Sequence, residues 1–275
     1  MTDRRAVFID FDGTFAQRGV APPAHGDAVA RVRGQGHAVL LSTGRPASIV
    51  APEVAELFDG VITSAGAHVR LGSEVLTDQR FPPALARQAV EVLTAHGVAF
   101  VLEAPEALWC SAPSAQRVRA RMRPRDGDEA AGLGNGPRDI LDALRVREDL
   151  AACSVAKISL WGSPVPVEQL ASEIGEEVGA LPSSLPTEDT ASGELHLRAV
   201  DKADGMQRVG EQLGIAPAAR IAIGDGLNDL GMLRAAGTAV AIAGGHDQVL
   251  AAADLVVPGP SQHGILTAFE RLGLL

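Results

Sequence analysis

The chain has 275 residues, of which 46% are hydrophobic and 21% are charged, and its formal net charge is −10. This apolar content excludes an intrinsically disordered protein, because burying it can offset the conformational entropy lost on folding. The acidic excess argues against a nucleic-acid partner, since affinity for a phosphate backbone rests on Lys and Arg.

Neither a membrane span nor a signal peptide is predicted. No uncharged apolar window approaches the roughly 20 residues that cross a bilayer, and the apolar stretch near the start is too short for a signal peptide. We therefore expect a soluble, cytoplasmic protein without a membrane partner. Cys110 and Cys153 are too few for a disulfide framework and fit no zinc-binding spacing, so we expect reduced, packed thiols.

Short apolar runs, each followed by polar or glycine-rich residues, recur near both ends of the chain. They predict strands at residues 6–9, 37–41, 60–63, 220–223 and 239–242, with helices between them, such as 47–58 and 229–236. Continuous apolar runs are typical of parallel strands that are covered on both faces. The alternation of strands and helices predicts an α/β fold, a Rossmann-like parallel sheet between helical layers.

The middle of the chain has a different pattern. A helix follows Pro82 and Pro83, and strands are expected at residues 98–102, 108–111 and 155–161. A second helix is expected at 167–178, with loops at 123–137 and 181–192. We infer an inserted α+β cap domain at residues 81–192, between the two parts of the core at 1–80 and 193–275.

Three of the predicted core strands end in polar, reactive residues. Ligands of open parallel sheets bind beyond the carboxyl ends of the strands, so we expect these residues to converge on one crevice. Several carboxylates at short range need a cation between them, and oxygen ligands without His or Cys favour Mg²⁺. The residues concerned are Asp10, Asp12, Thr43, Asp225, Asn228 and Asp229.

Only two of the 24 basic residues are lysines, Lys157 and Lys202. Lys202 opens a helix-like segment and is the candidate to neutralise phosphate oxygens, as a compact positive charge can. Lys157 lies within an expected strand of the insertion, and we interpret it as a solvated strand lysine.

Four segments, in order, resemble the motifs of the haloacid dehalogenase superfamily of phosphatases. They are Asp-Phe-Asp-Gly-Thr at residues 10–14, Ser-Thr-Gly-Arg-Pro at 42–46, Lys202, and Gly-Asp-Gly-Leu-Asn-Asp at 224–229. The long insertion before Lys202 is similar to the Cof-like branch, which carries a type-IIB cap. The resemblance covers nearly the whole chain, although the cap itself shows no matching motif.

The resemblance implies a role for each matching residue. Asp10 would attack phosphorus and form an aspartyl-phosphate, and Asp12 would be the general acid and base. Mg²⁺ would be bound by the side chains of Asp10 and Asp225 and by the backbone carbonyl of Asp12, with Asp229 in support behind them. The phosphate group would be held by Phe11, Thr43, Gly44, Lys202 and Asn228. The expected substrate is a small phosphate ester, a sugar or polyol phosphate.

Two other functions stay open at this point. A phosphotransferase or mutase would pass the phosphoryl group to a second alcohol instead of water. A non-catalytic regulatory protein could keep the fold, although retention of both Asp10 and Asp12 argues against it. In the cap, the arginines between residues 117 and 125 indicate a solvated segment, with a clasp for a second anionic group as the alternative.

Overall fold

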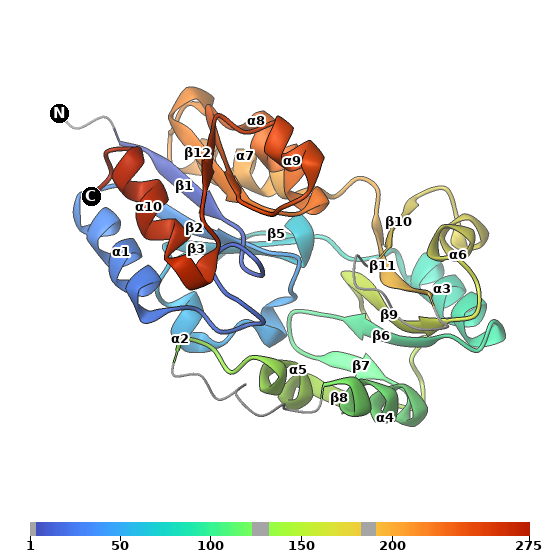
Figure 1. The fold of residues 1–275 in the computed structure, drawn as a ribbon. Helices are drawn as coiled ribbons and strands as arrows, with labels where there is room; N and C mark the ends of the chain where they lie inside the picture. The colour runs from blue at the N-terminus through green and yellow to red at the C-terminus, as the bar shows by residue number, and fades with distance from the viewer. Residues whose placement is uncertain (1–3, 123–131, 183–190) are drawn as a thin grey trace.

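The computed structural model describes residues 4–122, 132–182 and 191–275. Its strands form an eight-stranded sheet and a six-stranded sheet (Figure 1). The larger sheet is built from both ends of the chain, and the smaller sheet from the segment between them. The predicted fold class, an α/β unit interrupted by an α+β insertion, is therefore confirmed.

The eight-stranded sheet has its most apolar strands in the centre. The four strands β12, β1, β2 and β3 are buried along their whole length, as the continuous apolar runs predicted. The strands from β14 to β3 are parallel, whereas β4 and β5 form an antiparallel edge. The order across the sheet is β14 (Leu255–Val257), β13 (Thr238–Ile242), β12 (Arg220–Gly224), β1 (Ala6–Ile9), β2 (Ala38–Ser42), β3 (Gly60–Thr63), β4 (His68–Leu71) and β5 (Glu74–Asp78).

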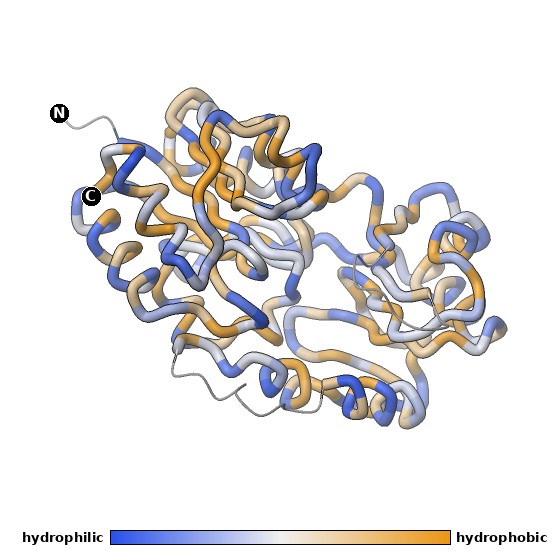
Figure 2. The backbone as a smooth tube through the Cα atoms, viewed as in Figure 1, coloured by the Kyte–Doolittle hydropathy of each residue, from blue (hydrophilic) through white to orange (hydrophobic). Residues whose placement is uncertain are grey.

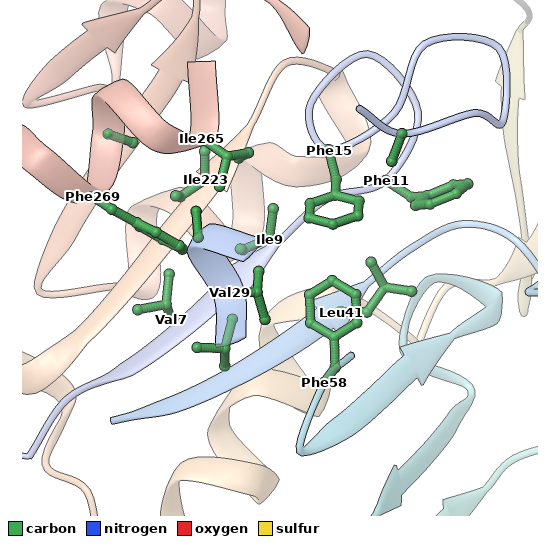
Figure 3. Packing of buried hydrophobic residues seen from close by; sticks show 14 of the residues in the cluster. Val7, Ile9, Phe11, Phe15, Val29, Leu41, Phe58, Ile223, Ile265 and Phe269 are labelled. Atoms are coloured by element: carbon green, nitrogen blue, oxygen red, sulfur yellow. The ribbon is translucent and has the colours of Figure 1, made fainter. Parts of the chain in front are cut away.

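Helices cover both faces of this sheet. Val7 and Ile9 of β1 belong to the apolar cluster formed with α1 (Pro23–Gly34) and α10 (Gly264–Arg271), shown in Figure 3. Ala6 and Phe8 point to the other face, towards α7 (Lys202–Gln212), α8 (Leu230–Ala235) and α9 (Asp247–Ala251). Along several of these helices hydrophobic and hydrophilic residues alternate, as expected for helices with one face on a sheet (Figure 2).

The six-stranded sheet is antiparallel except for the pair β7 and β8. Two helices, α3 (Pro83–Ala95) and α6 (Val167–Ile174), contribute to one apolar cluster, and α4 (Ala112–Arg121) and α5 (Pro137–Ala143) to a second. The strand order is β10 (Val178–Pro182), β11 (Ala191–Leu197), β9 (Lys157–Ser163), β6 (Ala99–Glu103), β7 (Leu108–Cys110) and β8 (Leu144–Val146).

Two predicted helices differ from the observed ones. The single helix expected at 47–58 is wrong: η1 (Ala47–Ile49) and α2 (Pro52–Ala55) are separate turns. Pro52 lacks a backbone N–H and disfavours helical geometry at Ala51, whose ψ is 137°. The helix expected at 167–178 ends at Ile174, and Val178 already begins β10.

Both predicted loops lie partly outside the described residues, at 123–131 and 183–190. The flanks of the second loop are strands, since residues 181–182 belong to β10 and 191–192 to β11. Because β11 pairs with β9, the predicted return to the core at residue 193 falls within a strand of the six-stranded sheet. The domain boundaries stay a prediction.

Two smaller expectations can be compared with the structure. Cys110 and Cys153 are buried and free, as predicted. Among the described residues, no helix has the length and apolar character needed to cross a membrane.

Candidate active site

The carboxyl ends of three adjacent strands carry the predicted site. In the sheet, β1 lies between β12 and β2, so the residues that follow these strands are neighbours. Asp10 follows β1, Thr43 follows β2 and Asp225 follows β12. Carboxylate oxygens of Asp10, Asp225 and Asp229 all lie within 4.8 Å of one another. The predicted convergence of distant segments is what the structure shows.

Lys202 is the centre of this arrangement. Its side chain is fully buried, and its ammonium donates to Oδ1 of Asp10 at 2.5 Å and to Oδ1 of Asp229 at 2.6 Å. Burial alone lowers the pKa of Lys202, but the two carboxylates outweigh burial and raise it above its ordinary value. Lys202 therefore stays charged and offsets part of the negative charge of the site.

The negative charges of Asp10 and Asp225 are only partly compensated. Burial, then the neighbouring charge of Asp229, raise the pKa of Asp10 well above its ordinary value, against the opposing effect of Lys202. Burial also raises the pKa of Asp225, although Thr14 donates a hydrogen bond of 2.8 Å to its Oδ1. A divalent cation would relieve both, because it favours the ionised form of each carboxylate.

The donor set fits Mg²⁺. Close carboxylate oxygens with no His or Cys among them are the ligands this cation prefers. The side chain of Asp229 already accepts from Lys202 and from the backbone amides of Asp225 and Gly226, at 3.1 and 3.0 Å. The Asp229 carboxylate therefore accepts from three donors, and its role beside a metal stays a prediction.

Asp12 faces a residue to which the sequence assigned no role. Arg45 makes a bidentate ion pair with it, with Nε 2.6 Å from Oδ2 and Nη2 2.8 Å from Oδ1. The guanidinium also lies 4.8 Å from the ring centroid of Phe11. Arg45 belongs to the second motif, at residues 42–46, and this position in the motif could have indicated a role in the site. Asp12 would have to leave this pair to act as an acid or base.

The predicted phosphate-binding residues gather beside these carboxylates. A Cβ placed on Gly44 would lie 3.5 Å from Nδ2 of Asn228, so these two residues face each other. The Thr43 hydroxyl accepts the backbone N–H of Arg45 at 3.1 Å. The Phe11 ring is buried in the apolar core, so Phe11 can offer a phosphate only its backbone.

The interpretation of Lys157 as a solvated lysine is wrong. Only 2% of Lys157 is exposed, and its ammonium donates to the backbone carbonyl of Gly44 at 2.7 Å. Glu194 lies 2.9 Å away and Glu103 3.3 Å away. The alternation pattern of one strand could not show that this position faces Gly44 of the larger unit.

The chain matches the family model for haloacid dehalogenase-like hydrolases over residues 7–269. The chain belongs to this family. The predicted resemblance to this family is confirmed. The matched range includes all four segments that carry the resemblance.

Individual relatives have phosphatase names. The chain is 41% identical over 76 residues to the phosphoglycolate phosphatase of Archaeoglobus fulgidus, a match that covers 28% of this chain and only 34% of that protein. It is 25% identical to YkrA of Bacillus subtilis, whose name describes a proposed phosphatase, over 99% of both chains. The chain thus spans about a third of the first curated phosphatases that it matches.

Solved structures share the fold. A protein described as the subclass IIB sugar phosphatase BT4131 has a TM-score of 0.75 at 21% identity, covering 98% of this chain and all of that one. A hypothetical protein of Geobacillus kaustophilus has a TM-score of 0.78 at 24% identity, covering 99% and 100%. At these identities the likeness concerns the fold, including the presence of a cap.

Proposed function

We propose that this protein is a Mg²⁺-dependent phosphatase that hydrolyses a small phosphorylated metabolite, a sugar or polyol phosphate, through an aspartyl-phosphate at Asp10. The observation that carries this proposal is the buried ammonium of Lys202, which donates to both Asp10 and Asp229. Carboxylate oxygens of these two residues and of Asp225 lie within 4.8 Å of one another. The family membership and the phosphatase names of the relatives support the same conclusion.

The chemistry of the site follows from its charges. Hydrolysis of a phosphate monoester requires acceleration by up to about 10²¹-fold, so developing negative charge must be stabilised by fixed groups. Asp10 and Asp225 would hold the Mg²⁺, which supplies positive charge to the phosphate oxygens when it is bound. Lys202 supplies a second positive charge, and Asn228 and the Gly44 backbone would hold the remaining oxygens.

The covalent step uses one oxygen of Asp10. This oxygen attacks phosphorus as the bond from phosphorus to the ester oxygen breaks, and Asp12 gives its proton to the departing alkoxide. The same Asp12 carboxylate then takes a proton from water, whose oxygen attacks phosphorus and releases Asp10. Since Asp12 is held by Arg45 as an ion pair in this structure, it must leave Arg45, turn towards the substrate and take up a proton from solvent before the first proton transfer.

The test is a phosphate-release screen with sugar, polyol and carboxylate-bearing phosphate esters in the presence of Mg²⁺. We expect turnover by the wild type, its loss by at least about a thousandfold in Asp10→Asn, and unchanged turnover in Asp27→Asn, the same change at an exposed residue of α1. Residual turnover in Asp10→Asn near the wild-type level would refute the covalent route. Substrate consumed without release of free phosphate would identify a phosphotransferase or mutase instead.

A further inference from the structure

The six-stranded sheet has one apolar and one polar face near its centre. Phe100, Leu102, Ile158, Leu160 and Leu195 all belong to the apolar cluster with α3 and α6. On the same three strands the alternate positions point the other way: Val101 and Trp161 pack in or against a second apolar cluster, and the polar ones beside them are Glu103, Lys157, Ser159, Glu194 and His196. Strand pairing places Lys157 opposite Glu103 and Ser159 opposite Glu194. The polar side chains therefore form one compact group.

This polar group lies against the candidate phosphate site. The Lys157 ammonium donates to the Gly44 carbonyl, and it would lie 3.7 Å from a Cβ at Gly44. A Cβ at that position would also contact Asn228. A second contact brings the two units together nearby, since the Ser48 hydroxyl donates to the carbonyl of Ala104 at 2.9 Å. The group therefore stands where the part of a substrate beyond its phosphate would lie.

Three members of this group, Glu103, Lys157 and Glu194, are charged. Together they have an excess of negative charge and carboxylate oxygens that can accept further hydrogen bonds. Two carboxylates, Glu103 and Glu194, share the single ammonium of Lys157. Glu103 is 6% exposed, and its Oε2 lies 3.3 Å from the Lys157 ammonium, but no described residue donates a hydrogen bond to this oxygen. Unfilled hydrogen-bonding capacity of a buried acceptor is costly, and a hydroxyl group of a ligand would fill it.

We propose that Glu103, Lys157 and Glu194 bind the leaving group of the substrate and select an uncharged, hydroxyl-bearing leaving group over one that carries a carboxylate. This inference rests on the proposed phosphatase function. Hydroxyl groups can donate to both glutamates and accept from Lys157, so a polyol or sugar satisfies all three residues. A carboxylate has no proton to donate and would face two like charges against one opposite charge.

The test compares two small esters with leaving groups of different charge, glycerol 1-phosphate and 2-phosphoglycolate. We expect a wild-type kcat/KM roughly tenfold or more higher for glycerol 1-phosphate, because like charges at short range disfavour the carboxylate. Glu194→Gln and Glu103→Gln each remove one negative charge while keeping size and shape. Both variants should reduce this ratio severalfold in favour of 2-phosphoglycolate.

Two controls make the outcomes distinguishable. Glu91→Gln makes the same change at an exposed residue of α3 and should leave the ratio unchanged. Because Glu103 is buried, the melting temperature of each variant is measured, and the partly exposed Glu194 provides the test if the Glu103 variant does not fold.

Hydrolysis of p-nitrophenyl phosphate tests the phosphatase activity separately. A wild type that is active on this ester but prefers 2-phosphoglycolate, or a ratio that neither glutamate variant changes, overturns the inference and leaves the phosphatase function standing. A wild type inactive on all three esters overturns both.

Discussion

Asp225 is partly buried and lies close to other carboxylates, and in the absence of a metal both features disfavour its charged form. It lies in a group of three carboxylates, and both burial and the neighbouring Asp229 favour its protonated form. Thr14 and Lys202 compensate in part, and Lys202 is already shared between two other carboxylates. At the scale of single residues, the site is therefore destabilising until a cation binds, which is the pattern expected of residues arranged for function rather than for stability.

This conflict predicts how stability depends on pH in metal-free protein. The folded-state pKa of Asp225 is raised, so its contribution is favourable at low pH and is lost as the pH rises through the folded pKa. Asp225→Asn, which cannot ionise and can still accept from Thr14, should increase the free energy of unfolding at pH 7 by on the order of 1 kcal/mol. The gain should disappear as the pH falls below 3.8, the ordinary pKa of an aspartate, because Asp225 is then protonated in both the folded and the unfolded state.

Urea unfolding in the presence of EDTA measures this difference. The same substitution at the exposed Asp27 provides the control and should have no effect at either pH. If Asp225→Asn destabilised the protein equally at both pH values, ionisation of Asp225 would not be the source of the instability.

At the scale of secondary structure, the first turn of α7 fixes Lys202. Asp201 is the N-cap, and its Oδ1 accepts the backbone N–H of Ala203 at 2.7 Å. The Asp204 side chain in turn accepts the backbone N–H of Asp201 at 3.1 Å. This reciprocal capping sets where the helix begins, and Lys202 is its first residue.

We expect Asp201→Ala to lower the free energy of unfolding by about 1 kcal/mol, the usual cost of removing an N-cap acceptor. Asp201→Asn keeps the acceptor oxygen and should lose only a few tenths of that amount. Urea unfolding of both variants makes the comparison. An equal loss in the Asn variant would assign the effect to the negative charge near the helix end instead of the hydrogen bond.

The sequence predicted the central elements well because their patterns are local. The buried strands of the large sheet, the helix starting at Lys202 and the strand-end position of Asp10 each follow from residues within a few positions of one another. The hairpin of β4 and β5 was not predicted, since its half-exposed residues form no continuous apolar run. Lys157 and Arg45 were misjudged or missed because their partners, Gly44 and Asp12, are distant in sequence.

At the scale of the whole molecule, the two units have mostly separate apolar cores. No described residue belongs to clusters of both sheets, although Ile49 of the larger unit packs in a cluster of the smaller unit and Leu133 of the smaller unit packs against the larger one. Contacts such as those of Lys157 with Gly44 and of Ser48 with Ala104 are polar. Separate cores allow the two units to unfold as separate cooperative steps.

Tryptophan fluorescence can follow the smaller unit alone. The chain has two tryptophans and no tyrosine, and both Trp109 and Trp161 lie in strands of the six-stranded sheet. Mg²⁺ would bind in the larger unit and stabilise it by about 2.7 kcal/mol at one hundred times its dissociation constant. We expect Mg²⁺ to raise the urea midpoint measured by far-UV circular dichroism, to which the larger unit contributes. The urea midpoint measured by tryptophan fluorescence should stay unchanged.

In Asp225→Asn, Mg²⁺ should move neither midpoint. Equal shifts of both signals in the wild type would show that the two units unfold together.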